Sequence, residues 1–107
     1  MQSASPAEVL ALLGQAFPGF EESFALAAGR GLAWSRVSTP FVRCASGKVI
    51  AHAGVLALPL IAEGRPRLVA GVHAVATDPA HRGQGLMRAV MEEALGFIDA
   101  RYETALL

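Results

Sequence analysis

The most constraining feature of the sequence is the segment Leu68–Ala76, in which nearly every residue is apolar. Side chains alternate between the two faces of a β-strand, so a strand over this segment would be apolar on both sides. A strand with two apolar faces is covered by other elements on both sides. The segment therefore predicts a central, covered strand. Its two faces would carry Val69, Gly71 and Val75 on one side and Ala70, Val72, Ala74 and Ala76 on the other.

The residues after this strand change to a helical period. Asp78 and Pro79 end the strand, and from about Gln84 the apolar residues recur along one side of a helix. The final segment, Arg101–Leu107, begins polar and ends apolar, which indicates the opening of another strand. The apolar side of the predicted helix carries Met87, Val90, Met91, Ala94, Leu95 and Ile98, and the opposite side carries Arg88, Glu92, Glu93 and Asp99.

The first part of the chain predicts two helices. Ser5, Pro6 and Glu8 form a helix start, because the serine caps, the proline suits the first turn and the glutamate completes a capping box. An apolar helical stripe follows, and Pro18 ends it. A second, short helix is expected over Phe20–Ala28.

Between these helices and the covered strand, the pattern is that of a hairpin. Phe41–Ala45 and Val49–Leu58 alternate like strands, with Ser46 and Gly47 as the turn, and a second turn is expected over residues 63–65. The element order predicts an α/β fold in the broad, α+β sense, with a central, mainly antiparallel sheet and flanking helices. We see no linker or repeat, so residues 1–107 are expected to form a single domain.

Composition excludes several classes of function. The 107 residues are 53% hydrophobic and 17% charged, with nine basic and nine acidic side chains, and this balance argues against nucleic-acid binding. The longest apolar stretch, Ala53–Ala62, is about half the length that a membrane span requires, and Met1–Ser5 does not resemble a signal peptide. Cys44 is the single cysteine, so we expect a buried thiol, neither disulfide nor metal site, and a cytoplasmic protein.

The segment with the clearest chemistry is His81–Leu86, a glycine-containing turn at the predicted helix start. The first N–H groups of a helix lack partners within the helix and lie at the positive end of its dipole, so they bind anions. Gly83 and Gly85 let the backbone approach a diphosphate closely. Arg82 and Arg88 add positive charge at either end, so this turn is a candidate phosphate site.

At these residues the chain resembles a known family. The stretch Val75–Met91, which reads VATDPAHRGQGLMRAVM, looks like the strand, loop and helix core of the GCN5-related N-acetyltransferases (GNAT). The family signature is Gln or Arg, two residues, Gly, one residue, then Gly or Ala. Arg82 and Gly85 match it, whereas Met87 replaces the final small residue and implies a bulkier wall there.

The resemblance implies both an acyl-coenzyme A N-acyltransferase fold and a set of site residues. Backbone groups of Val75, Ala76 and Thr77 would contact the pantetheine arm and thioester of acetyl-coenzyme A. The diphosphate would lie on the loop and the helix start. The reaction would be direct transfer of acetyl to an amine acceptor, with no nucleophilic serine or cysteine. The implied diphosphate set is Arg82, Gly83, Gln84, Gly85, Leu86, Met87 and Arg88.

The acceptor side of the site is less defined. His73, which alternation places on the face of Val75, is our candidate general base, since an imidazole titrates near neutral pH, with a packing role as the alternative. His52 is a weaker candidate, and His81 is expected to order the loop or touch the cofactor. Glu63, Glu92 and Glu93 are expected on the solvated surface. Trp34 and Phe41 lie where the family shapes its acceptor pocket, with core packing as the commoner role of a lone aromatic residue.

Compared with the family, the chain appears short at both ends, and Tyr102 comes too early to match the family's tyrosine acid. We therefore expect a fragment or a minimal member. Small amines, aminoglycoside-like compounds, peptide N-termini and lysine all remain open as acceptors. Two other functions also remain open: a non-catalytic module that binds coenzyme A or acyl-coenzyme A, and a homodimerisation domain whose edge strands a partner chain closes.

Overall fold

The structure, a computed structural model, describes residues 2–29 and 38–106. One of the aromatic residues singled out above, Trp34, lies outside the described residues. The elements are two helices, three long strands, a short 3₁₀ turn, a long helix and a short strand: α1 (Pro6–Ala16), α2 (Phe20–Gly29), β1 (Ser38–Ala45), β2 (Lys48–Ala62), β3 (Arg65–Thr77), η2 (Pro79–His81), α3 (Leu86–Arg101) and β4 (Ala105–Leu106).

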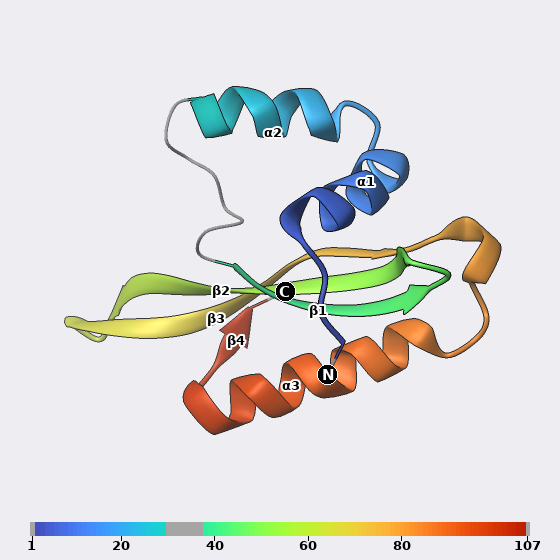
Figure 1. The fold of residues 1–107 in the computed structure, drawn as a ribbon. Coiled ribbons are helices and arrows are strands. Elements are labelled where there is room, and N and C mark those ends of the chain that lie inside the picture. The colour runs from blue at the N-terminus through green and yellow to red at the C-terminus, as the bar shows by residue number, and fades with distance from the viewer. Residues whose placement is uncertain (1, 30–37, 107) are drawn as a thin grey trace.

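The four strands form one sheet in the order β1-β2-β3-β4. The first three strands are antiparallel neighbours, while β4 runs parallel to β3 and pairs with it at Ala70 and Gly71. Figure 1 shows α1 and α2 on one side of this sheet and α3 on the other. The predicted fold class is therefore confirmed, with β3 in the interior of the sheet.

Local sequence signals explain most of the element boundaries. The Ser5 hydroxyl accepts a hydrogen bond from the Glu8 N–H (3.2 Å), and the Glu8 carboxylate accepts one from the Ser5 N–H (3.1 Å). These bonds lower the pKa of Glu8, the backbone bond from Ser5 contributing most. Both hairpin turns pair a residue of positive φ with a glycine of φ 75°: Ser46 with Gly47, and Glu63 with Gly64. The predicted capping box and turns are thus confirmed.

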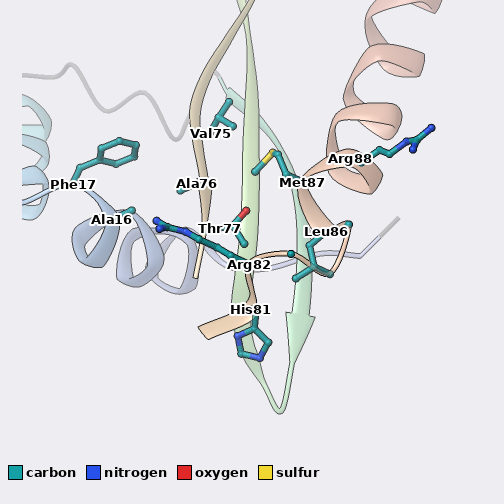
Figure 2. A pocket seen from close by; sticks show the side chains of 12 residues that line it. Ala16, Phe17, Val75, Ala76, Thr77, His81, Arg82, Leu86, Met87 and Arg88 are labelled. Atoms are coloured by element: carbon teal, nitrogen blue, oxygen red, sulfur yellow. The ribbon is translucent and has the colours of Figure 1, made fainter. Parts of the chain in front are cut away.

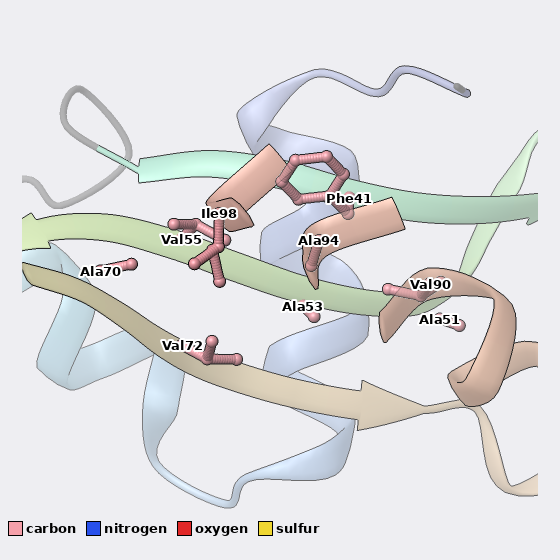
Figure 3. Packing of buried hydrophobic residues seen from close by; sticks show 9 residues of the cluster. All are labelled: Phe41, Ala51, Ala53, Val55, Ala70, Val72, Val90, Ala94 and Ile98. Atoms are coloured by element: carbon pink, nitrogen blue, oxygen red, sulfur yellow. The ribbon is translucent and has the colours of Figure 1, made fainter. Parts of the chain in front are cut away.

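Two apolar clusters hold the layers together, one on each face of the sheet. On the α3 face, Val90, Ala94 and Ile98 pack against the strands, as Figure 3 shows. On the α1 face, Val9, Leu12 and Leu13 pack against the sheet. The strand residues of the first cluster are Phe41, Ala51, Ala53, Val55, Ala70 and Val72, and those of the second are Val42, Val49 and Ala76.

Several details differ from the sequence-based expectation. The strands are longer than predicted, and the β2–β3 hairpin extends beyond the helices, so Leu68 is exposed although it begins the apolar run. Helix α3 starts at Leu86 rather than Gln84, and Leu95 is also exposed. Cys44 is half-buried rather than buried. Among the described residues, no helix is long and apolar enough to cross a membrane.

Candidate functional site

A pocket of about 430 Å³ lies where β3 ends and α3 begins. It is bounded by the end of α1, the last residues of β3, the loop and the first turn of α3, as Figure 2 shows. The pocket thus brings together segments that are far apart in the sequence, from residue 16 to residue 88. The lining residues are Ala16, Phe17, Val75, Ala76, Thr77, His81, Arg82, Gly83, Gly85, Leu86, Met87 and Arg88.

The structure gathers in this pocket all but one of the residues predicted to contact the cofactor; the exception is Gln84, which is not among the lining residues. His73, the candidate base, does not line it either. Sequence reasoning missed Ala16 and Phe17, which come from the end of α1. Only the packing of α1 across the sheet places them beside β3, and nothing local in the sequence signals that contact.

The two loop glycines fit a close ligand approach. Gly83 and Gly85 adopt φ values of 81° and 73°, in the left-handed region that residues with a side chain rarely occupy. A Cβ atom built on either glycine would meet no protein atom within 4 Å. Because both residues line the pocket, their missing side chains leave backbone open to whatever the pocket holds.

The start of α3 offers hydrogen-bond donors that no side chain caps. The N-cap is Gly85, which makes no side-chain capping bond, and the first backbone bond of the helix runs from the Ala89 N–H to the Gly85 carbonyl (3.1 Å). The amides of Leu86, Met87 and Arg88 precede that bond and therefore have no partner within the helix. Helix α1, in contrast, begins with a complete capping box. The open start of α3 is thus suited to an oxyanion.

Two arginines make this end of the pocket electropositive. Figure 2 shows Arg82 and Arg88 extending in opposite directions from the loop and from the first turn of α3. Arg88 bonds Glu92 at 3.3 Å, the i,i+4 partner, but both side chains are well exposed, so this pair is weak and easily exchanged.

The carboxylate that follows the end of β3, that of Asp78, is compensated by a cation. Asp78 is buried, lies 2.9 Å from the Lys48 ammonium and accepts a hydrogen bond from the Ala80 N–H (3.0 Å). The bond from Lys48, followed by that from Ala80, lowers the pKa of Asp78 below its ordinary value. Asp78 therefore stays ionised and caps the η2 turn, while Lys48 offsets its charge.

A β-bulge in β3 sets the direction of the strand end. Gly54 pairs with His73, yet His52, two residues back on β2, pairs with Ala76, three residues on along β3. His73 and Ala76 therefore lie on the same face, the α1 face, although regular alternation would separate them. Ala74 is the extra residue of the bulge, and its φ is 53°. The predicted placement of His73 on the face of Val75 is wrong, because alternation from Ala76 puts Val75 on the opposite side.

A buried histidine contacts the backbone of the bulge. His52 is fully buried, and its Nδ1 lies 2.7 Å from the Ala74 carbonyl oxygen. Burial lowers the pKa of His52, and the bond to Ala74 opposes that shift in part. The imidazole is therefore neutral at physiological pH.

His73 sits in a second polar contact on the α1 face. Its Nε2 and the Ser38 Oγ are 2.8 Å apart, in a half-buried position. A Cβ on Gly54 would lie 2.5 Å from that Nε2 and 2.7 Å from that Oγ, so only glycine leaves room for the pair. Burial, and secondarily the electrostatic interaction with nearby His52, lower the pKa of His73. His73 is thus a neutral imidazole at pH 7, able to accept a proton.

The other singled-out residues lie away from the pocket. Phe41 is 2% exposed and packs 5.3 Å from the Phe97 ring in the α3-face core, so it forms no pocket wall. Glu93 forms an ion pair with Arg43 on β1, so the expectation that Glu93 is a solvated surface residue is wrong. Glu63 is an exposed turn residue, as expected. Within the described part of the chain, no three His, Cys, Asp or Glu side chains group as metal ligands would.

Comparison with known proteins identifies one family for this chain. The family model for the acetyltransferase (GNAT) domain matches residues 1–106. A candidate acetyltransferase from Agrobacterium tumefaciens has the same fold with a TM-score of 0.70 and 26% identity, over 99% of this chain and 78% of that one. No curated protein sequence matches the chain significantly.

More distant structures share the fold. Glucosamine-6-phosphate N-acetyltransferase from Arabidopsis thaliana is 18% identical with a TM-score of 0.68, over 99% of this chain and 78% of that one. A predicted acetyltransferase from Clostridium acetobutylicum, solved with acetyl-coenzyme A, is 10% identical with a TM-score of 0.70, over 94% and 72% of the two chains.

Proposed function

Because the chain belongs to the GNAT acetyltransferase family, we propose that it binds acetyl-coenzyme A in the β3–α3 pocket and transfers the acetyl group to an amine. The observation that carries this proposal is the uncapped start of α3, flanked by two glycines of positive φ and two arginines. Amides of residues 86–88 would hold the diphosphate, and Arg82 and Arg88 would compensate its charge. None of the described residues that line this pocket carries a carboxylate.

The end of β3 supports the remaining contacts. Within the described chain, the edge of β3 that faces away from β2 pairs with β4 only at Ala70 and Gly71. From Val72 to Thr77, this edge therefore has no neighbouring strand among the described residues. Backbone groups on a strand edge bind extended ligands as an added strand would. We propose that Val75, Ala76 and Thr77 hold the pantetheine arm there. Acetyl-coenzyme A supplies the acetyl group as an activated thioester.

The acceptor chemistry requires a neutral amine. His73 is the base we propose, because its imidazole is neutral near pH 7, half-buried and oriented by Ser38. It would take the proton of the attacking nitrogen directly or through a water molecule. It acts from the α1 face, so the acceptor would approach from that side of the sheet. The proposed acceptor classes are small amines, aminoglycoside-like compounds, peptide N-termini and lysine side chains.

Thermal unfolding with and without acetyl-coenzyme A tests the binding step. We expect a rise in Tm for the wild-type chain, since a ligand at a hundred times its Kd adds about 2.7 kcal/mol. Gly85→Trp should abolish the rise by filling the pocket. Gly64→Trp is the matched control: Gly64 has nearly the same φ (75° against 73°) and equally open surroundings, but lies in the β2–β3 turn. An unchanged Tm in the folded wild-type chain would contradict the proposal.

An acceptor screen tests the transfer step separately. Release of free thiol from acetyl-coenzyme A in the presence of each amine class would support the enzyme function, and His73→Gln should slow it without changing the cofactor Kd. A chain that binds acetyl-coenzyme A but acetylates none of these classes would instead be the non-catalytic binding module.

Three coarser features complete the proposal. We propose that residues 1–107 act as one domain, because both apolar clusters are built on the same sheet, and a single cooperative unfolding transition would support this. We propose a cytoplasmic location, since the single cysteine suits a reducing compartment.

Homodimerisation is a further proposal. It is favoured by the exposed side chains of Ile61 and Leu68 on the β2–β3 hairpin, and light scattering tests it.

A further inference from the structure

The bulge of β3 places a residue with a side chain in an unfavourable conformation. Three non-glycine residues in the described chain have positive φ: Ser46, Glu63 and Ala74. The first two lie in hairpin turns, where a glycine follows and the turn itself requires that conformation. Ala74 lies inside a strand, with no glycine beside it. Some other contact must therefore stabilise the left-handed conformation at Ala74.

His52 supplies such a contact from the neighbouring strand. Its Nδ1 is 2.7 Å from the Ala74 carbonyl oxygen, and a carbonyl can only accept a hydrogen bond. The hydrogen must therefore be on Nδ1, which fixes the tautomer of a neutral imidazole. Since His52 is fully buried on β2, the ring is also fixed in position.

The pairing on either side of this contact shows what it controls. Before the bulge, Gly54 pairs with His73; after it, His52 pairs with Ala76 and Ala51 with Thr77. The extra residue moves Val75 to the face opposite His73 and directs the strand end into the pocket. The bulge thus places the side chain of His73, the proposed base, on the face opposite that of Val75, which begins the segment proposed to hold the pantetheine arm.

We propose that His52 is a positioning residue for acetyl-coenzyme A binding: its Nδ1–H holds the Ala74 carbonyl and so fixes the bulge that presents Val75–Thr77 to the pocket. His52 does not line the pocket and acts through the β3 backbone. His52 is fully buried and its Nδ1 contacts a backbone carbonyl, in agreement with a structural hydrogen bond rather than proton transfer with an acceptor. This inference rests on the proposed function for its ligand, but the tautomer and the bulge are observable without one.

The ligand-free test uses NMR of the labelled chain. The nitrogen shifts of His52 are expected to show the Nδ1–H tautomer, and a strong NOE between the amide and Hα protons of Ala74 to show a positive φ. In His52→Leu, the amide signals of residues 73–77 should move and this Ala74 NOE should weaken. An Nε2–H tautomer, or a bulge unchanged in His52→Leu, would overturn the inference whether or not the chain binds acetyl-coenzyme A.

The binding test separates positioning from loss of stability. We expect His52→Leu to raise the Kd for acetyl-coenzyme A about tenfold, the equivalent of one lost buried hydrogen bond. His52→Asn should restore much of the affinity, because its amide can donate from nearly the place of Nδ1. Ala74→Gly should partly rescue His52→Leu, because glycine adopts positive φ without support.

Val55→Ala, a buried β2 change on the opposite face, is the control for general destabilisation and should leave the Kd unchanged. Equal losses in Val55→Ala and His52→Leu, or no rescue by either Asn or Gly, would assign His52 to packing alone. No binding by the wild-type chain would refute the proposed function and leave the NMR result to decide the role of His52.

Discussion

Replacing Gly85 by alanine should separate the backbone cost of the loop from its role in binding. The φ of Gly85 is 73°, a conformation that costs an L-residue about 1–2 kcal/mol in the folded state. Alanine also lowers the entropy of the unfolded chain, which offsets roughly 0.4–1 kcal/mol of that cost. The added Cβ meets no protein atom within 4 Å, so no steric clash adds to this. The net loss of stability is therefore about 1 kcal/mol, with a few tenths more because alanine is a poor N-cap.

Gly64→Ala provides the matched comparison. Gly64 has a φ of 75°, its Cβ would also meet nothing within 4 Å, and it lies in the β2–β3 turn outside the pocket. Both variants should therefore lower Tm by about 5 °C, since 1 kcal/mol corresponds to roughly 4–8 °C in a domain of this size. Only Gly85→Ala should also weaken acetyl-coenzyme A binding.

Calorimetric titration of both variants measures the difference. We expect the Kd of Gly85→Ala to rise about tenfold, because the new methyl group projects into the pocket and holds the ligand away from the α3 amides. Gly64→Ala should bind as the wild type does. Equal affinities in the two variants would refute the assignment of the loop as the diphosphate site, whatever their stabilities.

Other predictions concern pH, the contact between His73 and Ser38, and the first helix. Burial lowers the pKa of His52 and His73, so the unfolded chain binds more protons below about pH 6.5, and stability should fall as pH decreases from that value toward the folded pKa values. Urea unfolding at pH 7.5 and 5.0 measures this, and equal stability at the two would contradict it. Gly54→Ala, whose Cβ would lie 2.5 Å from the His73 Nε2, should slow acetyl transfer while leaving the cofactor Kd unchanged; a rise in Kd alone would place its effect elsewhere. Ser5→Ala should cost about 1 kcal/mol by thermal denaturation, because it removes the α1 cap.

The parts of the fold that sequence predicts are those that depend on neighbouring residues. The capping box at Ser5 and the turn glycines Gly47 and Gly64 act over two to four positions, so their structures follow from local chemistry. The candidate phosphate loop is recognisable for the same reason. Gly83 and Gly85 precede an apolar-faced helix, and both line the pocket.

The parts that sequence does not predict depend on pairing between distant strands and helices. Alternation along β3 put His73 and Val75 on one face, but the register with β2 inserts a bulge at Ala74. No residue near Ala74 signals it, because the side chain that contacts the Ala74 carbonyl, His52, lies 22 positions earlier.

Long-range packing also explains the other errors. Phe17 reaches the pocket only because α1 crosses the sheet, and its own sequence context indicates a helix end. Glu93 reads as a surface acid on α3, yet β1 places Arg43 beside it. In both cases the residues brought together lie at least fifty positions apart in the sequence.

An NMR titration of the labelled chain with acetyl-coenzyme A tests directly whether the β3–α3 loop binds the cofactor. We expect saturable shifts in the amides of Val75–Thr77 and Gly83–Arg88, the two segments that meet in the pocket. The amides of the β2–β3 turn, Glu63 and Gly64, should not move. Shifts centred anywhere else, or no shifts at millimolar ligand in a folded sample, would contradict the claim that the β3–α3 loop binds the cofactor.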